Sequence, residues 1–242
     1  MSSKPKIKNS DEDKFGTDIK LIIIGNSSTG KTSIVNQFIN KKFTREYSAT
    51  IASDFQYKIL KVDNLIYRIQ FWDLAGQDKS QTYIGLFCRD IHGIIICCSC
   101  DDIKSREDTK EWKKSLNEIK DNWVPIILCE NKCDIYGDTE EDYLKDVESL
   151  RTFAEENDFL TAFRTSAKNN YNISEMITYL INYLKDNHAD KIVKSYISDS
   201  NDDTLSEKSK SIKNVKIERT KKNVDSFSRC GNTVNTRGCL AL

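Results

Sequence analysis

The chain has 242 residues, of which 38% are apolar and 31% charged, and its 37 basic and 37 acidic side chains give a formal net charge of zero. This length predicts one or two domains, and the zero balance lacks the basic excess typical of nucleic-acid-binding proteins. Only two histidines accompany the eight cysteines, which argues against a zinc site, and no apolar run approaches the roughly 18 residues of a membrane span.

The predicted elements alternate between strands and helices. A polar stretch to residue 17 precedes a strand at 19–24, a helix at 33–40, a loop at 41–53 and a hairpin whose strands run through 55–59 and 65–71. After a loop at 73–82 follow strands at 93–99, 124–129 and 160–165 and helices at 105–122, 139–157 and 173–187. This order predicts an α/β fold, with a mostly parallel sheet covered on both faces. We expect one domain at 18–187, between a flexible extension at 1–17 and a flexible tail at 188–242.

The first functional motif lies between the first strand and the first helix. Residues 25–32 read Gly-Asn-Ser-Ser-Thr-Gly-Lys-Thr, which fits the phosphate-binding pattern G-x-x-x-x-G-K-[ST]. The glycines let backbone N–H groups surround an anion, the lysine can reach the β- and γ-phosphates, and the threonine hydroxyl can ligate Mg²⁺. We expect the phosphates to be held by Ser28, Thr29, Gly30, Lys31, Thr32 and Ser33.

Two further segments supply groups for a metal and for water. Asp73 follows a strand and suits a Mg²⁺–phosphate site, usually through a coordinated water. The Gly76 N–H can approach the γ-phosphate, and the Gln77 amide, which both donates and accepts, can orient an attacking water. Thr50, in the loop after the first helix, can complete the metal shell. We therefore predict the metal ligands Thr32, Thr50 and Asp73 and the catalytic residue Gln77.

A third set of residues predicts recognition of guanine. Asn131, Lys132 and Asp134 form the pattern N-K-x-D after a buried strand. The Asp134 carboxylate can accept both N1–H and N2–H of guanine, a pair that adenine lacks. Asn131 can brace the loop and meet N7, and the Lys132 stem can cover the base. After the last strand come Ser166, Ala167 and Lys168, where the alanine N–H can donate to guanine O6. Each motif alone also fits an ordinary polar turn, but their order is specific.

These motifs, in this order, resemble those of the Ras superfamily of small GTPases over residues 20–185. The resemblance implies a six-stranded sheet with five helices and a Mg²⁺-dependent GTP/GDP switch that hydrolyses GTP. It also places Phe43 against the base, seven residues before Thr50. It implies a monomer that works with an exchange factor, a GTPase-activating protein and effectors. Since no intrinsic arginine finger is identifiable, a partner is expected to supply one.

Within the superfamily the chain looks most similar to the Rab family, which acts in vesicle traffic. Residues 50–55 read T-I-A-S-D-F and residues 68–73 read R-I-Q-F-W-D, close to the Rab strings T-I-G-V-D-F and K-L-Q-I-W-D. Ser99 departs from the family, which has aspartate there. The alternatives are a Ras- or Rho-type signalling GTPase and a GTP-binding scaffold with little hydrolysis. Intact Thr50, Asp73 and Gln77 argue against the scaffold.

The tail predicts attachment to a membrane. Residues 191–242 carry eleven Lys/Arg against six Asp/Glu, a net of +5, and residues 208–222 alone carry seven against one, a net of +6. The final four residues, Cys-Leu-Ala-Leu from Cys239 onward, read as a CaaX box whose leucine favours geranylgeranylation. Lipid and basic charge together would bind an anionic leaflet. We expect a prenyl transferase and an escort protein as partners, and a lipid-anchored location on the cytoplasmic face of an intracellular membrane, with a cytosolic pool.

Overall fold

The computed structural model describes residues 17–46, 50, 53–62, 65–77, 80–117 and 124–192. The strands are β1 (Thr17–Gly25), β2 (Ser53–Val62), β3 (Leu65–Leu74), β4 (Gly93–Ser99), β5 (Ile126–Asn131) and β6 (Thr161–Arg164). The α-helices are α1 (Lys31–Asn40), α2 (Gln81–Gly85), α3 (Ile103–Glu107), α4 (Thr109–Asn117), α5 (Glu140–Tyr143), α6 (Val147–Glu156) and α7 (Ile173–Asn187). Within these described residues no helix is long and apolar enough to cross a membrane.

The six strands form one sheet in the order β2-β3-β1-β4-β5-β6. β2 pairs antiparallel with β3 as the predicted hairpin, and every other neighbouring pair is parallel. Parallel strands are joined by crossing helices, which cover both faces of the sheet. The predicted six-stranded, mostly parallel α/β fold is therefore confirmed.

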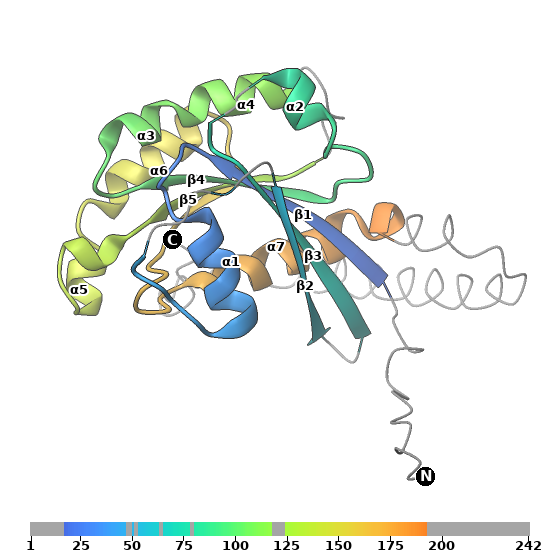
Figure 1. The fold of residues 1–242 in the computed structure, drawn as a ribbon, viewed down its shortest axis with the longest axis horizontal. Coiled ribbons are helices and arrows are strands. Elements are labelled where there is room, and N and C mark those ends of the chain that lie inside the picture. Colours follow the sequence, from blue (N-terminus) through green and yellow to red (C-terminus); the bar gives the residue numbers. More distant parts are fainter. Residues whose placement is uncertain are drawn as a thin grey trace, which may run out of the picture.

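Helices lie on both faces of the sheet (Figure 1), and a cluster of buried apolar side chains fills the space on each face. On one face α1 and α7 pack their apolar stripes, including Phe38 and Leu180, against the strands. On the other face lie α2, α4 and α6, with Trp112 of α4 and Leu150 of α6 in the core. Every residue of β4 is buried, as expected for a central strand covered on both sides.

Two of the expected helices are each divided. The helix predicted at 105–122 begins earlier, at Ile103, and is interrupted at Asp108, where the Thr109 hydroxyl donates to the Arg106 carbonyl at 2.6 Å. The helix predicted at 139–157 is interrupted before Asp146, whose φ of 57° is incompatible with a continuous helix. Residues 118–123 lie outside the described part of the chain.

Other boundaries shift by a few residues. The segment after Gln77 contains the short helix α2, whose first turn is capped by the Ser80 hydroxyl accepting from the Tyr83 N–H. Beyond α7, Ile192 is 2% exposed and packs in the core, so the folded body extends past Asn187. Because β1, β3, β5 and β6 end at the same edge, the loops that follow them meet there.

Candidate nucleotide site

The loop after β1 has a backbone that only glycine can adopt at two points. Gly25 has φ of 137°, and a Cβ there would lie 2.0 Å from the Cys97 carbonyl oxygen of β4. Gly30, directly before α1, has φ of 90°, and its Cβ would lie 2.2 Å from Nδ2 of Asn131. These close approaches explain both glycines of the phosphate-loop pattern.

Lys31, the first residue of α1, points back into this loop. Its Nζ donates to the Gly25 carbonyl at 3.0 Å and to the Asn26 carbonyl at 2.9 Å. Burial lowers the pKa of Lys31 from its usual value, since the charged ammonium has lost much of its hydration. A buried cation held by two carbonyl oxygens at the start of a helix favours an anion close by.

Three oxygen-bearing side chains from three segments gather next to Lys31. The Thr32 hydroxyl donates to Oδ2 of Asp73 at 2.5 Å and lies 2.9 Å from the Thr50 hydroxyl. Asp73 is 1% exposed, and burial raises its pKa to about 6. Among the described residues its Oδ1 has no hydrogen-bond partner. A buried carboxylate with a spare oxygen beside two hydroxyls fits the ligand set of a hard divalent cation.

Gly76 packs directly against the phosphate loop. A Cβ on this residue would lie 2.4 Å from the Ser27 nitrogen and 2.6 Å from the Gly25 carbonyl oxygen, so no other residue fits without displacing the loop. Gln77, next in the chain, is exposed and lines the same cavity as Lys31 and Thr32. The segment after β3 therefore lies against the segment after β1.

The side chain of Asn131 joins three loops. Its Nδ2 donates to the Thr29 carbonyl at 3.0 Å, and its Oδ1 accepts from the Ala167 N–H at 3.1 Å and the Thr165 hydroxyl at 3.3 Å. Asn131 is 1% exposed, so water is excluded from its amide, and the hydrogen bonds above satisfy both its donor and its acceptor. The bracing predicted for Asn131 is present, whereas the Ala167 N–H expected to meet the base pairs with Asn131 in this structure.

Asp134 lines the cavity, and its carboxylate is oriented by two partners. Oδ1 accepts from the Ser166 hydroxyl at 2.6 Å, and Oδ2 lies 3.3 Å from Nζ of Lys168. Ser166 also accepts from the Asn169 N–H at 3.1 Å. Residues of the loop after β6 thus hold the carboxylate of Asp134, which lies in the loop after β5.

Lys132 is held by Asp101, a residue that the sequence analysis did not single out. Its Nζ lies 3.0 Å from Oδ2 of Asp101, and the Ser99 hydroxyl donates to the same carboxylate. The backbone of Lys132 has φ of 68°, which turns the chain into the 3-10 helix at Cys133–Ile135. Ser99, the departure from the Rab pattern, therefore supports the carboxylate that holds Lys132.

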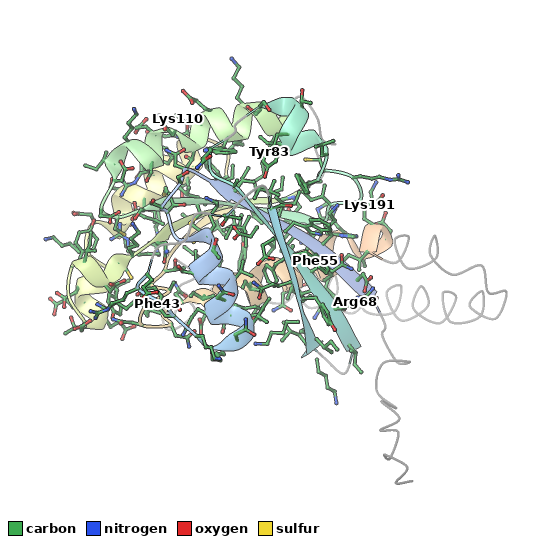
Figure 2. The ribbon with its side chains drawn as sticks, viewed as in Figure 1. Phe43, Phe55, Arg68, Tyr83, Lys110 and Lys191 are labelled. Carbon is green, nitrogen blue, oxygen red and sulfur yellow. The ribbon has the colours of Figure 1, made fainter. Side chains whose placement is uncertain are left out.

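These segments surround one cavity of about 770 Å³. Most of the predicted site residues line it: Ser28, Gly30, Lys31, Thr32, Ser33, Phe43, Thr50, Gly76, Gln77, Asn131, Lys132, Asp134, Ala167 and Lys168. Thr29, Asp73 and Ser166 lie behind this surface and contact it through the hydrogen bonds above. Phe43 lies beside α1, toward the α5 end of the molecule, far from Arg68 on β3 (Figure 2).

The cavity also has lining residues that sequence reasoning missed. They come from the phosphate loop, α1, the loop after it and the 3-10 helix: Ser27, Asn36, Asn40, Lys42, Thr44, Arg45, Glu46 and Ile135. The loop after α1 carries no periodicity or motif, so only its proximity to the phosphate loop could have suggested that its residues line the cavity. Lys42 and Arg45 add cationic groups to a site that already holds Lys31.

Comparison with known proteins identifies the family. The Ras family model matches residues 20–186, most of the described chain. The chain belongs to the Ras family. Among curated proteins, this Ras-family chain is 34% identical to the Ras-related protein RABG3b of Arabidopsis thaliana, over 66% of this chain and 79% of the relative. It is 28% identical to the Ras-related protein Rab-32A of Dictyostelium discoideum, over 69% of this chain and 78% of the relative.

A third relative, the Ras-related protein Rab7 of Pisum sativum, is 31% identical over 66% of this chain and 78% of its own length. The Rab-named relatives confirm the predicted resemblance within the Ras superfamily. The protein is a Rab-like small GTPase, an enzyme class that binds guanine nucleotides and hydrolyses GTP. Exchange factors, GTPase-activating proteins and effectors are the general partners of this class.

Proposed function

We propose that this Ras-family GTPase is a Rab-type switch that alternates between GDP and GTP on a membrane surface in vesicle traffic. The observation that carries the proposal is the meeting of Thr32, Thr50 and Asp73 beside Lys31. These side chains come from α1, the loop after it and β3, so a γ-phosphate and its metal would be sensed by three segments at once.

The metal in this proposal is Mg²⁺, held by Thr32, Thr50 and, directly or through water, Asp73. When bound, Mg²⁺ would neutralise charge that develops on the β- and γ-phosphates. Lys31 would exchange its two carbonyl partners, at 3.0 and 2.9 Å, for phosphate oxygens. The other phosphate contacts come from backbone N–H groups around Ser28, Thr29 and Gly30 and at Ser33.

For hydrolysis, Gln77 would hold the attacking water through its amide, and the Gly76 N–H would face the γ-phosphate. Gln77 is exposed, so a partner protein can reach it. Hydrolysis by the isolated protein would be slow, with the GTPase-activating partner supplying an arginine to the transition state.

Guanine would be read by Asp134, whose carboxylate is oriented by Ser166 and Lys168. Asn131 keeps the loops after β5 and β6 against the phosphate loop, and Lys132 and Phe43 would cover the base. The Ala167 N–H, which now donates to Oδ1 of Asn131 at 3.1 Å, would donate to guanine O6 instead, or to both oxygens.

Effectors would bind an aromatic patch on β2, β3 and the segment around α2. The ring centroids of Phe55 and Trp72 are 4.9 Å apart, those of Trp72 and Phe87 5.7 Å, and those of Phe87 and Tyr83 5.5 Å. Phe55 is 46% exposed. The Tyr83 hydroxyl accepts from the Ala75 N–H, next to Gly76, so ordering of that segment by GTP would change the patch.

Membrane attachment would come from a geranylgeranyl group on Cys239 together with the basic residues 208–222, all outside the described residues. One lipid chain binds reversibly, and about seven cationic side chains add roughly 1 kcal/mol each near an anionic leaflet. A prenyl transferase would add the lipid, and an escort protein would keep a cytosolic pool of the monomer soluble.

Fractionation of cells that express the tagged protein tests this proposal. We expect the wild type in both membrane and cytosolic fractions, on one class of intracellular membrane, and Cys239→Ser wholly in the cytosolic fraction. Cys230→Ser is the matched control, because it removes a thiol from the same tail without touching the CaaX box. Cys239→Ser that remains on membranes as well as the wild type contradicts the anchoring mechanism.

A further inference from the structure

The side chain of Asn26, inside the phosphate loop, is held by two residues that lie far away in the sequence. Its Nδ2 donates to Oδ2 of Asp108 at 2.8 Å, and its Oδ1 accepts from the indole N–H of Trp112 at 2.9 Å. Asp108 lies between α3 and α4, and Trp112 is a core residue of α4 that is 1% exposed. Donor and acceptor atoms of one amide are thus both used, which fixes its orientation.

The backbone of Asn26 is equally engaged. Its carbonyl oxygen accepts from Nζ of Lys31 at 2.9 Å and from the Thr29 hydroxyl at 2.9 Å. Asn26 therefore connects α4 to two residues of the phosphate loop. If its side chain were released, the carbonyl that holds the Lys31 ammonium would lose its fixed position.

Gly76 also packs against this backbone, because a Cβ there would lie 2.5 Å from the Asn26 carbonyl carbon. The loop is thus in close contact with Gly76 and hydrogen-bonded to α4 and the residue before it. A preorganised loop binds an anion more tightly than a mobile one, because less ordering is left to be done on binding.

We propose that Asp108 and Trp112 are positioning residues for the nucleotide phosphates, acting through Asn26 on Lys31 and the loop backbone. This inference rests on the proposed function, because it assigns the loop after β1 to the phosphates. Asp108 and Trp112 touch Asn26 rather than the cavity, whose lining they do not join. Their effect should fall on phosphate binding and spare base recognition, which is built on the loops after β5 and β6.

The test is the GDP dissociation rate of the full chain, measured for the wild type, Asn26→Ala, Trp112→Phe and the double variant. Trp112→Phe keeps an aromatic ring in the core but removes the indole donor. We expect Trp112→Phe to speed dissociation about fivefold, the effect of losing one neutral hydrogen bond, and Asn26→Ala, which removes two bonds, to speed it more. In the Asn26→Ala background, Trp112→Phe should add nothing further, because the two residues act through one contact.

Two controls separate positioning from general destabilisation. Leu116→Ala removes a fully buried side chain from the same helix but leaves the indole and carboxylate that hold Asn26, and it should leave the dissociation rate near that of the wild type. The ratio of dissociation rates for GDP and inosine diphosphate, which lacks the amine that Asp134 would bind, should be the same in all variants. If Trp112→Phe proves insoluble, Asp108→Ala replaces it.

The inference is overturned if Trp112→Phe or Asp108→Ala dissociates GDP like the wild type. It is also overturned if the two changes multiply in the double variant, or if Leu116→Ala speeds dissociation as much. If the wild type discriminates GDP from inosine diphosphate but the variants release GDP at the wild-type rate, this inference alone is contradicted. A wild type that does not bind GDP contradicts the proposed function and this inference together.

Discussion

Thr32 donates a hydrogen bond of 2.5 Å to Oδ2 of Asp73, although 41 residues separate them in the chain. The parallel pairing of β1 with β3 creates this contact, since Ile23 lies opposite Asp73 and the phosphate loop then carries Thr32 back over the strand end. The pair leaves Oδ1 of Asp73 buried without a hydrogen-bond partner among the described residues. A cation at this point would satisfy that oxygen.

Thr32→Asn should lose a metal ligand that matters most when the γ-phosphate is present. We expect affinity for GTP with Mg²⁺ to fall relative to GDP by about 10- to 100-fold, the range for one bond to a charged group. Thr32→Ser keeps the hydroxyl and serves as the control. Titration of both nucleotides with and without Mg²⁺ measures the effect, and equal losses in the asparagine and serine variants would mean that the hydroxyl is not a ligand.

Asp134→Asn replaces an acceptor with an amide that can donate. Since xanthine presents an oxygen where guanine has its amine, preference should move from GDP toward xanthosine diphosphate. Asp138→Asn, in the same loop but outside the cavity lining, should keep the preference for GDP. Competition between the two nucleotides measures the change, and an unchanged preference in Asp134→Asn would remove Asp134 from base recognition.

The burial of His92 should make the fold sensitive to acid. Its Nδ1 accepts from the Lys20 N–H at 3.1 Å, and burial lowers its pKa from 6.5 to about 4. The unfolded chain therefore binds a proton more readily between these values, so stability is full above pH 6.5 and falls as the pH drops toward 4. The loss from this group approaches roughly 3 kcal/mol in the free energy of unfolding.

Urea unfolding at fixed GDP concentration checks this for the wild type and His92→Asn, which offers an amide oxygen as acceptor but does not titrate. The variant should lose less stability between pH 6.5 and 4. Parallel declines for both proteins would show that other groups, chiefly carboxylates, account for the acid sensitivity.

The sequence predicted the parts of the site whose chemistry depends on residue type at fixed spacing. Gly25, Gly30 and Lys31 could be recognised because few other residues satisfy a tight anion-binding loop. The boundary of α7 was equally clear, because Ile173 to Asn187 show uninterrupted helical spacing. The strand ending at Asn131 was predicted two residues too early, since the polar end of β5 does not look like a strand.

Other contacts join residues too distant for any local pattern. Glu130 is fully buried between Arg106 and Arg164, yet charged residues in a sequence ordinarily predict exposure. The bond from Trp112 to Asn26 spans 86 residues and could not be inferred from helical spacing, which only places Trp112 in the core.

Gln77→Leu keeps a similar side-chain volume but removes the amide that would align water. Hydrolysis of GTP stimulated by a GTPase-activating protein should fall by orders of magnitude, while GTP binding is retained. Gln70→Leu, on β3 and outside the cavity lining, is the control and should hydrolyse GTP normally. A normal stimulated rate in Gln77→Leu would assign the water to another residue.

The most direct test of the GTPase switch is a single-turnover assay on the full-length wild type, loaded with GTP and started by adding Mg²⁺. We predict that the protein slowly releases one phosphate per bound GTP and retains GDP, while ATP offered at the same concentration is neither bound nor hydrolysed. GTP that stays bound without conversion after prolonged incubation, or equal turnover of ATP, would contradict a guanine-specific hydrolytic switch.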